Sequence, residues 1–125
     1  MILDTCALLF LASGDERLSR KTRGRLSDAP TRWFCAISAY EVALKYQKAK
    51  LKLPVPPVQW IDEVARRYVL SELPLDSALC CAAAALPAHH RDPFDRFIIA
   101  GAKRLDCAVV TVDPIFASYG VEVAN

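Results

Sequence analysis

The sequence has no long hydrophobic run and no regular set of cysteines. Its longest uncharged stretch near the N-terminus, residues 5–14, is too short to span a bilayer. No basic segment precedes this stretch, so we expect no secretory signal, and the expected compartment is the cytoplasm. The five cysteines form neither an even disulfide framework nor spaced metal-binding pairs, so we expect reduced thiols, packed mostly in the core. They are Cys6, Cys35, Cys80, Cys81 and Cys107.

Histidine is scarce as well. Only His89 and His90 are present, next to each other in a polar segment that follows Leu86-Pro87. With no other histidine and no suitably spaced cysteine, a zinc site would lack ligands. We therefore expect both histidines to be exposed loop residues, close to a bound phosphate if they take part in function.

The chain is long enough to bury one hydrophobic core. Its 125 residues are 54% apolar and 24% charged, which predicts one domain over residues 1–125. The net charge of +2 says little about partners, but basic residues gather in two segments, 17–25 and 45–52. Each segment is either a solvated helix face or a patch that holds a phosphate backbone.

Short hydrophobic runs alternate with helical patterns along the chain. Strands are predicted at residues 1–3, 33–37, 108–112, within 68–75 and, as a short fifth strand, at 121–123. Helices are predicted over 5–12, 19–27, 38–49, 58–67, 76–86 and 92–105. This alternation predicts an α/β fold, with a parallel sheet of four to five strands covered by helices on both faces. Gly101 in the last helix would allow a close approach to the sheet.

Acidic residues follow several of these strands. Asp4 closes the first strand, Glu41 follows the second, and Asp113 follows the fourth, while Asp95 lies in the first turn of the last helix. Carboxylates that follow parallel strands meet at the carboxyl edge of the sheet. Four acids in one crevice repel each other and cannot all stay ionised without a cation, so we expect a divalent metal site. Oxygen ligands favour Mg²⁺ or Mn²⁺ over zinc.

Each acid also has a purely structural explanation. Glu41 with Ser38 matches a capping box, in which the glutamate reaches back to the N-cap amide. Asp92 fits the N-cap of the last helix, and this explanation is favoured over a functional one. Asp4 could cap the first helix, but Thr5 is available for that position.

Three further residues have open roles. Asp95 could merely complement the helix dipole, and Asp113 could merely begin the turn before Pro114. Arg96 could pair with a carboxylate or contact a substrate. Individually these signals are weak, but the acids together, at strand ends of one α/β domain, favour a functional site.

The order and spacing of these residues resemble the PIN-domain family. The similarity runs from Asp4 to about Tyr119, and its most specific part is residues 91–96, with the sequence RDPFDR, followed by a helix rich in small residues. The other matching segments are residues 1–5, 38–45, 51–54, 99–102 and 110–113. Within the family, the chain is similar to the VapC-type toxins of bacterial toxin–antitoxin pairs.

The resemblance implies a PIN-like three-layer fold and a metal-dependent endoribonuclease, usually dimeric and held inactive by an antitoxin. The family's acidic quartet falls on Asp4, Glu41, Asp95 and Asp113, with Asp92 as an auxiliary acid. Under this hypothesis three aspartates hold one or two Mg²⁺ or Mn²⁺ ions, and Glu41 acts directly or through water. Cleavage would leave 5′-phosphate and 3′-hydroxyl ends. The candidate RNA-binding residues are Arg20, Lys21, Arg23 and Lys45.

Two other functional classes stay open. A phosphatase of the haloacid type would need a second acid where Cys6 stands, and a phospho-receiver would need an acidic pair near its first strand. The other class is a non-catalytic RNA-binding or partner-binding domain on the same fold. All four acids are present in this sequence, which counts against a domain that has lost its catalytic site.

Overall fold

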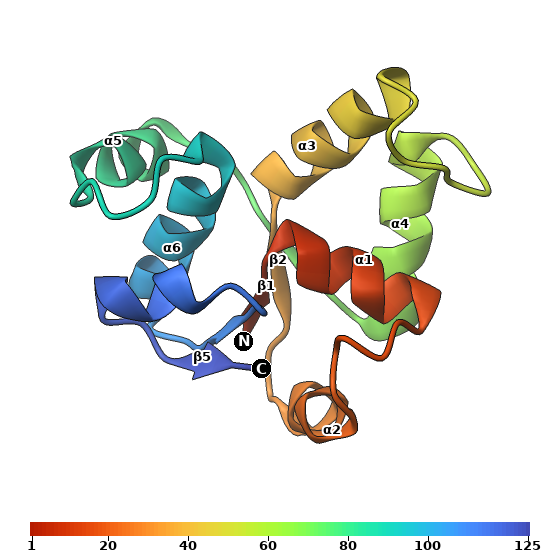
Figure 1. Ribbon diagram of the computed structural model, residues 1–125, viewed down its shortest axis with the longest axis horizontal. Helices are drawn as coiled ribbons and strands as arrows, with labels where there is room; N and C mark the ends of the chain where they lie inside the picture. The colour runs from red at the N-terminus through yellow and green to blue at the C-terminus, as the bar shows by residue number, and fades with distance from the viewer.

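Five short strands form one parallel sheet in the computed structural model, which describes residues 1–125 (Figure 1). The strand order is β3-β2-β1-β4-β5, and all neighbouring strands are parallel. The strands are β1 (Ile2–Leu3), β2 (Trp33–Cys35), β3 (Ser71–Leu73), β4 (Val109–Val110) and β5 (Val123–Ala124). The predicted α/β class is therefore confirmed, with five strands.

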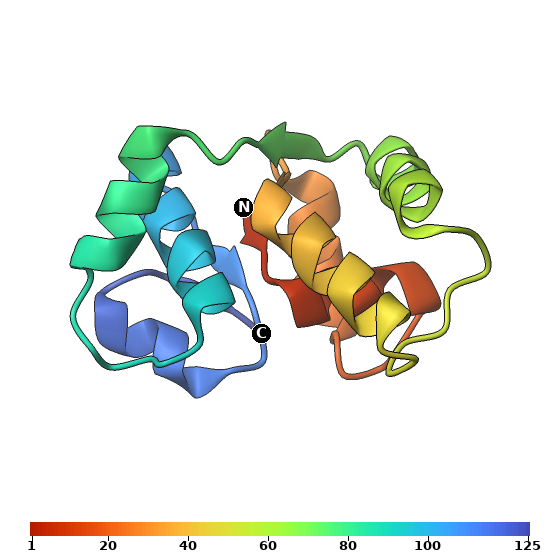
Figure 2. The same ribbon diagram turned by 90° about the horizontal axis from the view of Figure 1, so that it is seen from above.

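Helices cover both faces of this sheet. They are α1 (Thr5–Ser13), α2 (Arg20–Asp28), α3 (Ala36–Gln47), α4 (Pro57–Tyr68), α5 (Ser77–Ala85), α6 (Pro93–Leu105) and the 3-10 helix η1 (Pro114–Tyr119). Figure 2 shows α1, α3 and α4 on one side of the molecule, and α5, α6 and η1 on the other. The arrangement has three layers, as a PIN-like fold requires.

Successive strand residues face opposite layers of the molecule. Ile2 and Val109 belong to the core that α5, α6 and η1 cover, whereas Leu3 and Val110 belong to the core under α1 and α4. All four side chains are fully buried. Such continuous burial is typical of a parallel sheet sandwiched between helices.

Helix α6 lies close to the sheet because a glycine stands at the contact. A Cβ atom on Gly101 would come within 2.6 Å of Leu73 Cδ2 and 3.3 Å of Ile2 Cδ1. The predicted close approach at Gly101 is therefore confirmed. This contact fixes how α6 lies across the sheet, and so where the first turn of α6 is held.

Helix α3 begins earlier than the sequence predicts. It starts at Ala36, directly after β2, with Cys35 at the N-cap and no side-chain capping bond. The predicted N-cap, Ser38, is instead buried inside the first turn, and its Oγ lies 2.9 Å from Thr5 Oγ1. The two hydroxyls satisfy each other in the interior, so the predicted N-cap at Ser38 is wrong.

Other local predictions have mixed outcomes. Asp92 caps α6 as expected, and Ser19 and Asp76 cap α2 and α5, each of the three side chains accepting a hydrogen bond from a backbone amide. All five cysteines are free, but only Cys35 is buried, and both cysteines of α5 are exposed. The expectation that most cysteines lie in the core is therefore wrong. No helix in the chain is both long and apolar enough to cross a membrane.

Candidate metal centre

The topology brings Asp4 and Asp113 to the same edge of the sheet. Asp4 follows β1 directly, and Asp113 follows β4, which is the hydrogen-bonded neighbour of β1. Helices α3 and α6 contact each other and bring Glu41 and Asp95 toward the same edge. The charges of Glu41 and Asp113 act on Asp4, and those of Asp4 and Glu41 act on Asp95. The four predicted acids therefore form one electrostatically linked group.

Asp4 is held by hydrogen bonds to both carboxylate oxygens. Its Oδ1 accepts from the Ala7 backbone amide at 2.7 Å, so Asp4 is the N-cap of α1, and the prediction that Thr5 fills this position is wrong. Its Oδ2 accepts from the buried Thr111 hydroxyl. Burial raises the pKa of Asp4, the bonds from Thr111 and Ala7 lower it, and the charge of Asp113 raises it further. This carboxylate has a fixed orientation.

Glu41 is buried and only half satisfied. Its Oε2 lies 2.9 Å from Lys45 Nζ, one turn along α3, whereas its Oε1 is buried without a hydrogen-bond partner. The pKa of Lys45 is raised, chiefly by its hydrogen bond to Glu41. Because Ser38 is not an N-cap, the capping-box explanation of Glu41 no longer holds. A buried carboxylate oxygen without a partner costs free energy, and it is a position where a ligand or a water would be stabilised.

Asp95 and Asp113 meet across a single histidine. His90 Nε2 lies 2.9 Å from Asp95 Oδ2 and 3.2 Å from Asp113 Oδ2. Burial raises the pKa of Asp95 to about 7, the charge of Asp92 raises it as well, and His90 lowers it. The other oxygen of Asp113, Oδ1, accepts from the Ile115 amide at 2.9 Å and caps η1.

The structure corrects the expectation for His90. Its side chain is only 12% exposed, and ligand atoms of His90, Asp95 and Asp113 all lie within 4.8 Å of one another. His89 is exposed, as expected, with its ring against the edge of Tyr119. Sequence reasoning missed His90, and the one available signal was its position in the loop that leads into α6, five residues before Asp95.

Asp92 and Arg96 have structural roles in the same loop. Asp92 caps α6 by accepting from the Phe94 amide at 2.9 Å, and its charge also acts on Asp95. The Arg96 guanidinium pairs with no carboxylate. It donates to backbone carbonyl oxygens of five residues at the end of α5 and in the loop, so it ties down the loop that carries His90. These residues are Ala83, Ala84, Leu86, Pro87 and His90.

The candidate RNA-binding residues are separated in space. Lys45 lies beside the acids, paired with Glu41. Arg23 donates to three backbone carbonyls, those of Phe10 in α1 and of Asp15 and Leu18 in the loop that follows, and is not the free cation that the sequence suggested.

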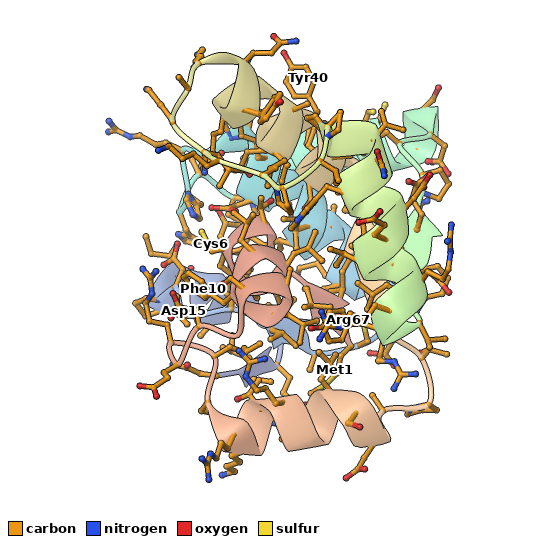
Figure 3. All side chains as sticks on the ribbon, turned by 90° about the vertical axis from the view of Figure 1, so that its right-hand side faces the viewer. Met1, Cys6, Phe10, Asp15, Tyr40 and Arg67 are labelled. Carbon is orange, nitrogen blue, oxygen red and sulfur yellow. The ribbon has the colours of Figure 1, made fainter.

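Arg20 and Lys21 are exposed on α2. This helix lies beside Met1, at the amino edge of the sheet, whereas Tyr40, the neighbour of Glu41, lies at the opposite end of the molecule (Figure 3). RNA bound at the acids would have to extend along the molecule to reach α2.

The chain as a whole also matches proteins of known family. A family model described as PIN domain matches residues 1–122. The chain belongs to the PIN domain family. A comparison with curated proteins finds no significant match to the sequence.

Several solved structures share this PIN fold. The chain is similar to one in VapBC2 from Rickettsia felis bound to a promoter DNA fragment, with a TM-score of 0.73 and 15% identity over 99% of this chain and 96% of that chain. The chain is also similar to one in DNA-bound VapBC from Salmonella typhimurium, with a TM-score of 0.70 and 19% identity over 98% of this chain and 95% of that chain. For a chain in FitAcB from Neisseria gonorrhoeae, the TM-score is 0.66 and the identity is 21%, over 99% of this chain and 96% of that chain. At these identities the likeness shows the fold.

Proposed function

We propose that this PIN domain is a metal-dependent endoribonuclease of the VapC type, the toxin of a toxin–antitoxin pair. The observation that supports it best is the convergence of Asp4, Glu41, Asp95 and Asp113 at one edge of the sheet, with the pKa values of Asp4 and Asp95 both raised. Acids crowded in this way are destabilising unless a cation neutralises them. An alternative non-catalytic domain on the same fold would not need to keep this arrangement.

The residues present fit a divalent ion. Asp4, Asp95 and Asp113 supply hard carboxylate oxygens, the ligand type that Mg²⁺ and Mn²⁺ prefer. Glu41 Oε1 is buried and unpartnered, so it is free to join the ion directly or through water. We propose one or two Mg²⁺ or Mn²⁺ ions held by the three aspartates.

When bound, the metal would neutralise charge on the attacked phosphate and lower the pKa of the attacking water. Glu41 would accept the proton of that water at its free Oε1, while the Lys45 ion pair holds the other oxygen. Asp4 would keep its orientation through its bonds to Ala7 and Thr111. Attack by the water oxygen on phosphorus would break the P–O3′ bond, and the departing 3′-oxygen would take up a proton from solvent, which gives 5′-phosphate and 3′-hydroxyl ends. The 2′-hydroxyl of RNA is not the nucleophile in this scheme.

A nuclease acting on RNA in the cytoplasm of its own host must be blocked, and we propose that a cognate antitoxin does this. The similar structures include VapBC and FitAcB assemblies. Helix α4 exposes Val58 at its start, and Val69 at its C-cap is exposed too, which offers an apolar contact for a partner helix. A basic side chain from that partner would compete with the metal for the acids. A homodimer, typical of the resembled family, is part of the same proposal.

Growth of a bacterial host tests the toxin assignment. Induced alone, the wild-type chain should arrest growth, and the Asp95→Asn variant, expressed to the same level, should not. Co-expression with the small protein encoded beside it should restore growth to the wild-type strain. Normal growth with soluble, RNA-cleaving wild-type protein would contradict the toxin assignment while leaving the nuclease chemistry standing.

A further inference from the structure

His90 is held in place on several sides. Its backbone amide donates to Tyr119 Oη at 2.6 Å, and Tyr119 in turn donates to the Pro87 carbonyl at 2.9 Å. The ring stands edge-on to Phe116, with 6.1 Å between centroids, and the backbone carbonyl accepts from Arg96. Phe116 and Tyr119 are buried. The imidazole is therefore fixed by the packing of η1 and α6.

The hydrogen bonds of the ring assign its tautomer. Nδ1 accepts from the Asp92 backbone amide at 3.2 Å, so Nδ1 carries no hydrogen. The ring hydrogen is therefore on Nε2, which faces the Oδ2 atoms of Asp95 and Asp113 at 2.9 and 3.2 Å. One N–H group lies between two carboxylates that would otherwise repel each other.

We propose that His90 is a positioning residue, whose Nε2–H bridges Asp95 and Asp113 and orients both carboxylates toward one metal ion. This inference rests on the metal site of the proposed function. A carboxylate oxygen has more than one lone pair, so the same Oδ2 accepts from His90 and still binds an ion. Hydrogen-bond partners of this kind commonly account for about 10–100-fold in metal affinity.

The same tautomer makes His90 a poor ligand. A histidine binds metal through the lone pair of an unprotonated ring nitrogen, and here that nitrogen, Nδ1, is engaged by the Asp92 amide. The ion would then meet oxygen atoms alone, which favours Mg²⁺ and Mn²⁺ over Zn²⁺. The bridge therefore accounts for a histidine in the centre of a site that does not use nitrogen as a ligand.

Two substitutions at one position separate the bridge from the loop contact. In His90→Asn, the side-chain oxygen still accepts from the Asp92 amide, but the side chain is too short to reach the carboxylates. In His90→Gln, the longer amide places an N–H donor near the position of Nε2. His89→Asn makes the same chemical change on the exposed neighbour and serves as the matched control.

The measurement is Mn²⁺ binding to the metal-free full chain, by calorimetry and by electron paramagnetic resonance of free Mn²⁺. We expect His90→Asn to weaken binding by about tenfold or more, His90→Gln by much less, and His89→Asn not at all. Melting temperatures are recorded alongside. A lower melting temperature with unchanged Mn²⁺ affinity would mean that His90 only supports the fold, which overturns the proposal. Tighter binding by His90→Asn would mean that the ring competes with the ion, and overturns it as well.

Nitrogen-15 spectra of the wild-type ring provide a second test that needs no variant. We expect the ring hydrogen of His90 on Nε2, and a hydrogen on Nδ1 instead would overturn the proposal even if His90→Asn failed to fold. Wild-type protein that binds no Mn²⁺ would contradict the metal site itself, and the inference with it. Wild-type binding with an unaffected His90→Asn variant would contradict the inference alone.

Discussion

The buried Thr111 hydroxyl donates to Oδ2 of Asp4, joining the residue that follows β1 to the residue that follows β4. Thr111 Oγ1 also accepts from the Asp113 backbone amide at 3.0 Å. One hydroxyl therefore orients one acid of the candidate site through its side chain and a second through its backbone. Residues 110–113, with the sequence VTVD, include Thr111 and Asp113, but the sequence alone does not indicate these two hydrogen bonds. We call this pair of bonds the Thr111 relay.

We expect Thr111→Val, which keeps the shape and removes the hydroxyl, to weaken Mn²⁺ binding and RNA cleavage by about tenfold or more. The Thr111 hydrogen bond lowers the pKa of Asp4, so its loss raises that pKa further. The acidic limb of the activity profile should therefore move to higher pH. Thr111→Ser, which keeps the hydroxyl, should retain Mn²⁺ binding and RNA cleavage near the wild-type level. An unshifted profile in Thr111→Val would show that the relay does not act on Asp4.

The raised pKa of Asp95 determines how we expect the stability of the metal-free protein to depend on pH. Its folded-state pKa of about 7 lies above the ordinary 3.8, so the folded state holds the proton more tightly than the unfolded chain. Stability contributed by the protonated group is complete at low pH and is lost as pH rises from about 4 toward 7. Thermal unfolding in EDTA should show this decline in wild-type protein.

The Asp95→Asn variant should lose most of that decline and melt at a higher temperature than wild type at pH 8, because it carries no crowded carboxylate. Asp62→Asn, on the exposed face of α4, is the matched control and should behave as wild type. Mg²⁺ should stabilise wild-type protein at pH 8 and have little effect on Asp95→Asn. Parallel pH curves for wild type and Asp95→Asn would contradict the crowding argument.

Glu41→Gln tests the role of the unpartnered oxygen. We expect a loss of about a hundredfold or more in RNA cleavage, because an amide cannot accept the proton of the attacking water. The free energy of unfolding should change by only about 1 kcal/mol or less, because the lost ion pair involves a half-exposed Lys45. Cleavage assays and denaturant unfolding on the same preparation measure both. Near-normal cleavage by Glu41→Gln would mean that Glu41 has only a structural role.

Arg20 and Lys21 remain candidate RNA contacts that the structure leaves exposed. With the Asp95→Asn background to prevent cleavage, replacing both by glutamate should flatten the salt dependence of binding, by about 0.7 in log–log slope for each lost phosphate contact. The control is a second double variant, in which glutamate replaces Arg66 and Lys103. These residues are exposed on other helices, so the change in net charge is the same. Equal slopes for the two double variants would identify the basic face of α2 as solvated surface.

Much of the fold and part of the site could be predicted from the sequence, for specific physical reasons. Buried runs bounded by turn residues mark the strands, and parallel strands end at one edge, so Asp4 and Asp113 had to lie close together. The glycine at 101 indicated a close helix–sheet contact, and the structure shows its partner, Leu73. These predictions depend on periodicity and chain direction alone.

The remaining features depend on how loops fold. His90 joins the acids because the segment before α6 packs on η1, and residue order does not encode that path. Arg23 and Arg96 look like free cations in the sequence, yet each donates to loop carbonyls whose directions only the folded chain sets. The start of α3 decides whether Glu41 is a capping residue, and the sequence pattern SAYE fits both alternatives.

Cleavage of RNA by the purified chain, with Mg²⁺ and with EDTA, tests the central claim most directly. Wild-type protein should cut RNA internally with Mg²⁺ or Mn²⁺, stop in EDTA, and leave 5′-phosphate and 3′-hydroxyl ends. Asp4→Asn and Asp95→Asn should be folded and inactive, whereas Glu122→Gln, which removes an exposed acid paired with Arg25, should cleave normally. Cleavage that persists in EDTA, or full activity in either aspartate variant, would contradict the assignment of the acids to a metal-dependent nuclease.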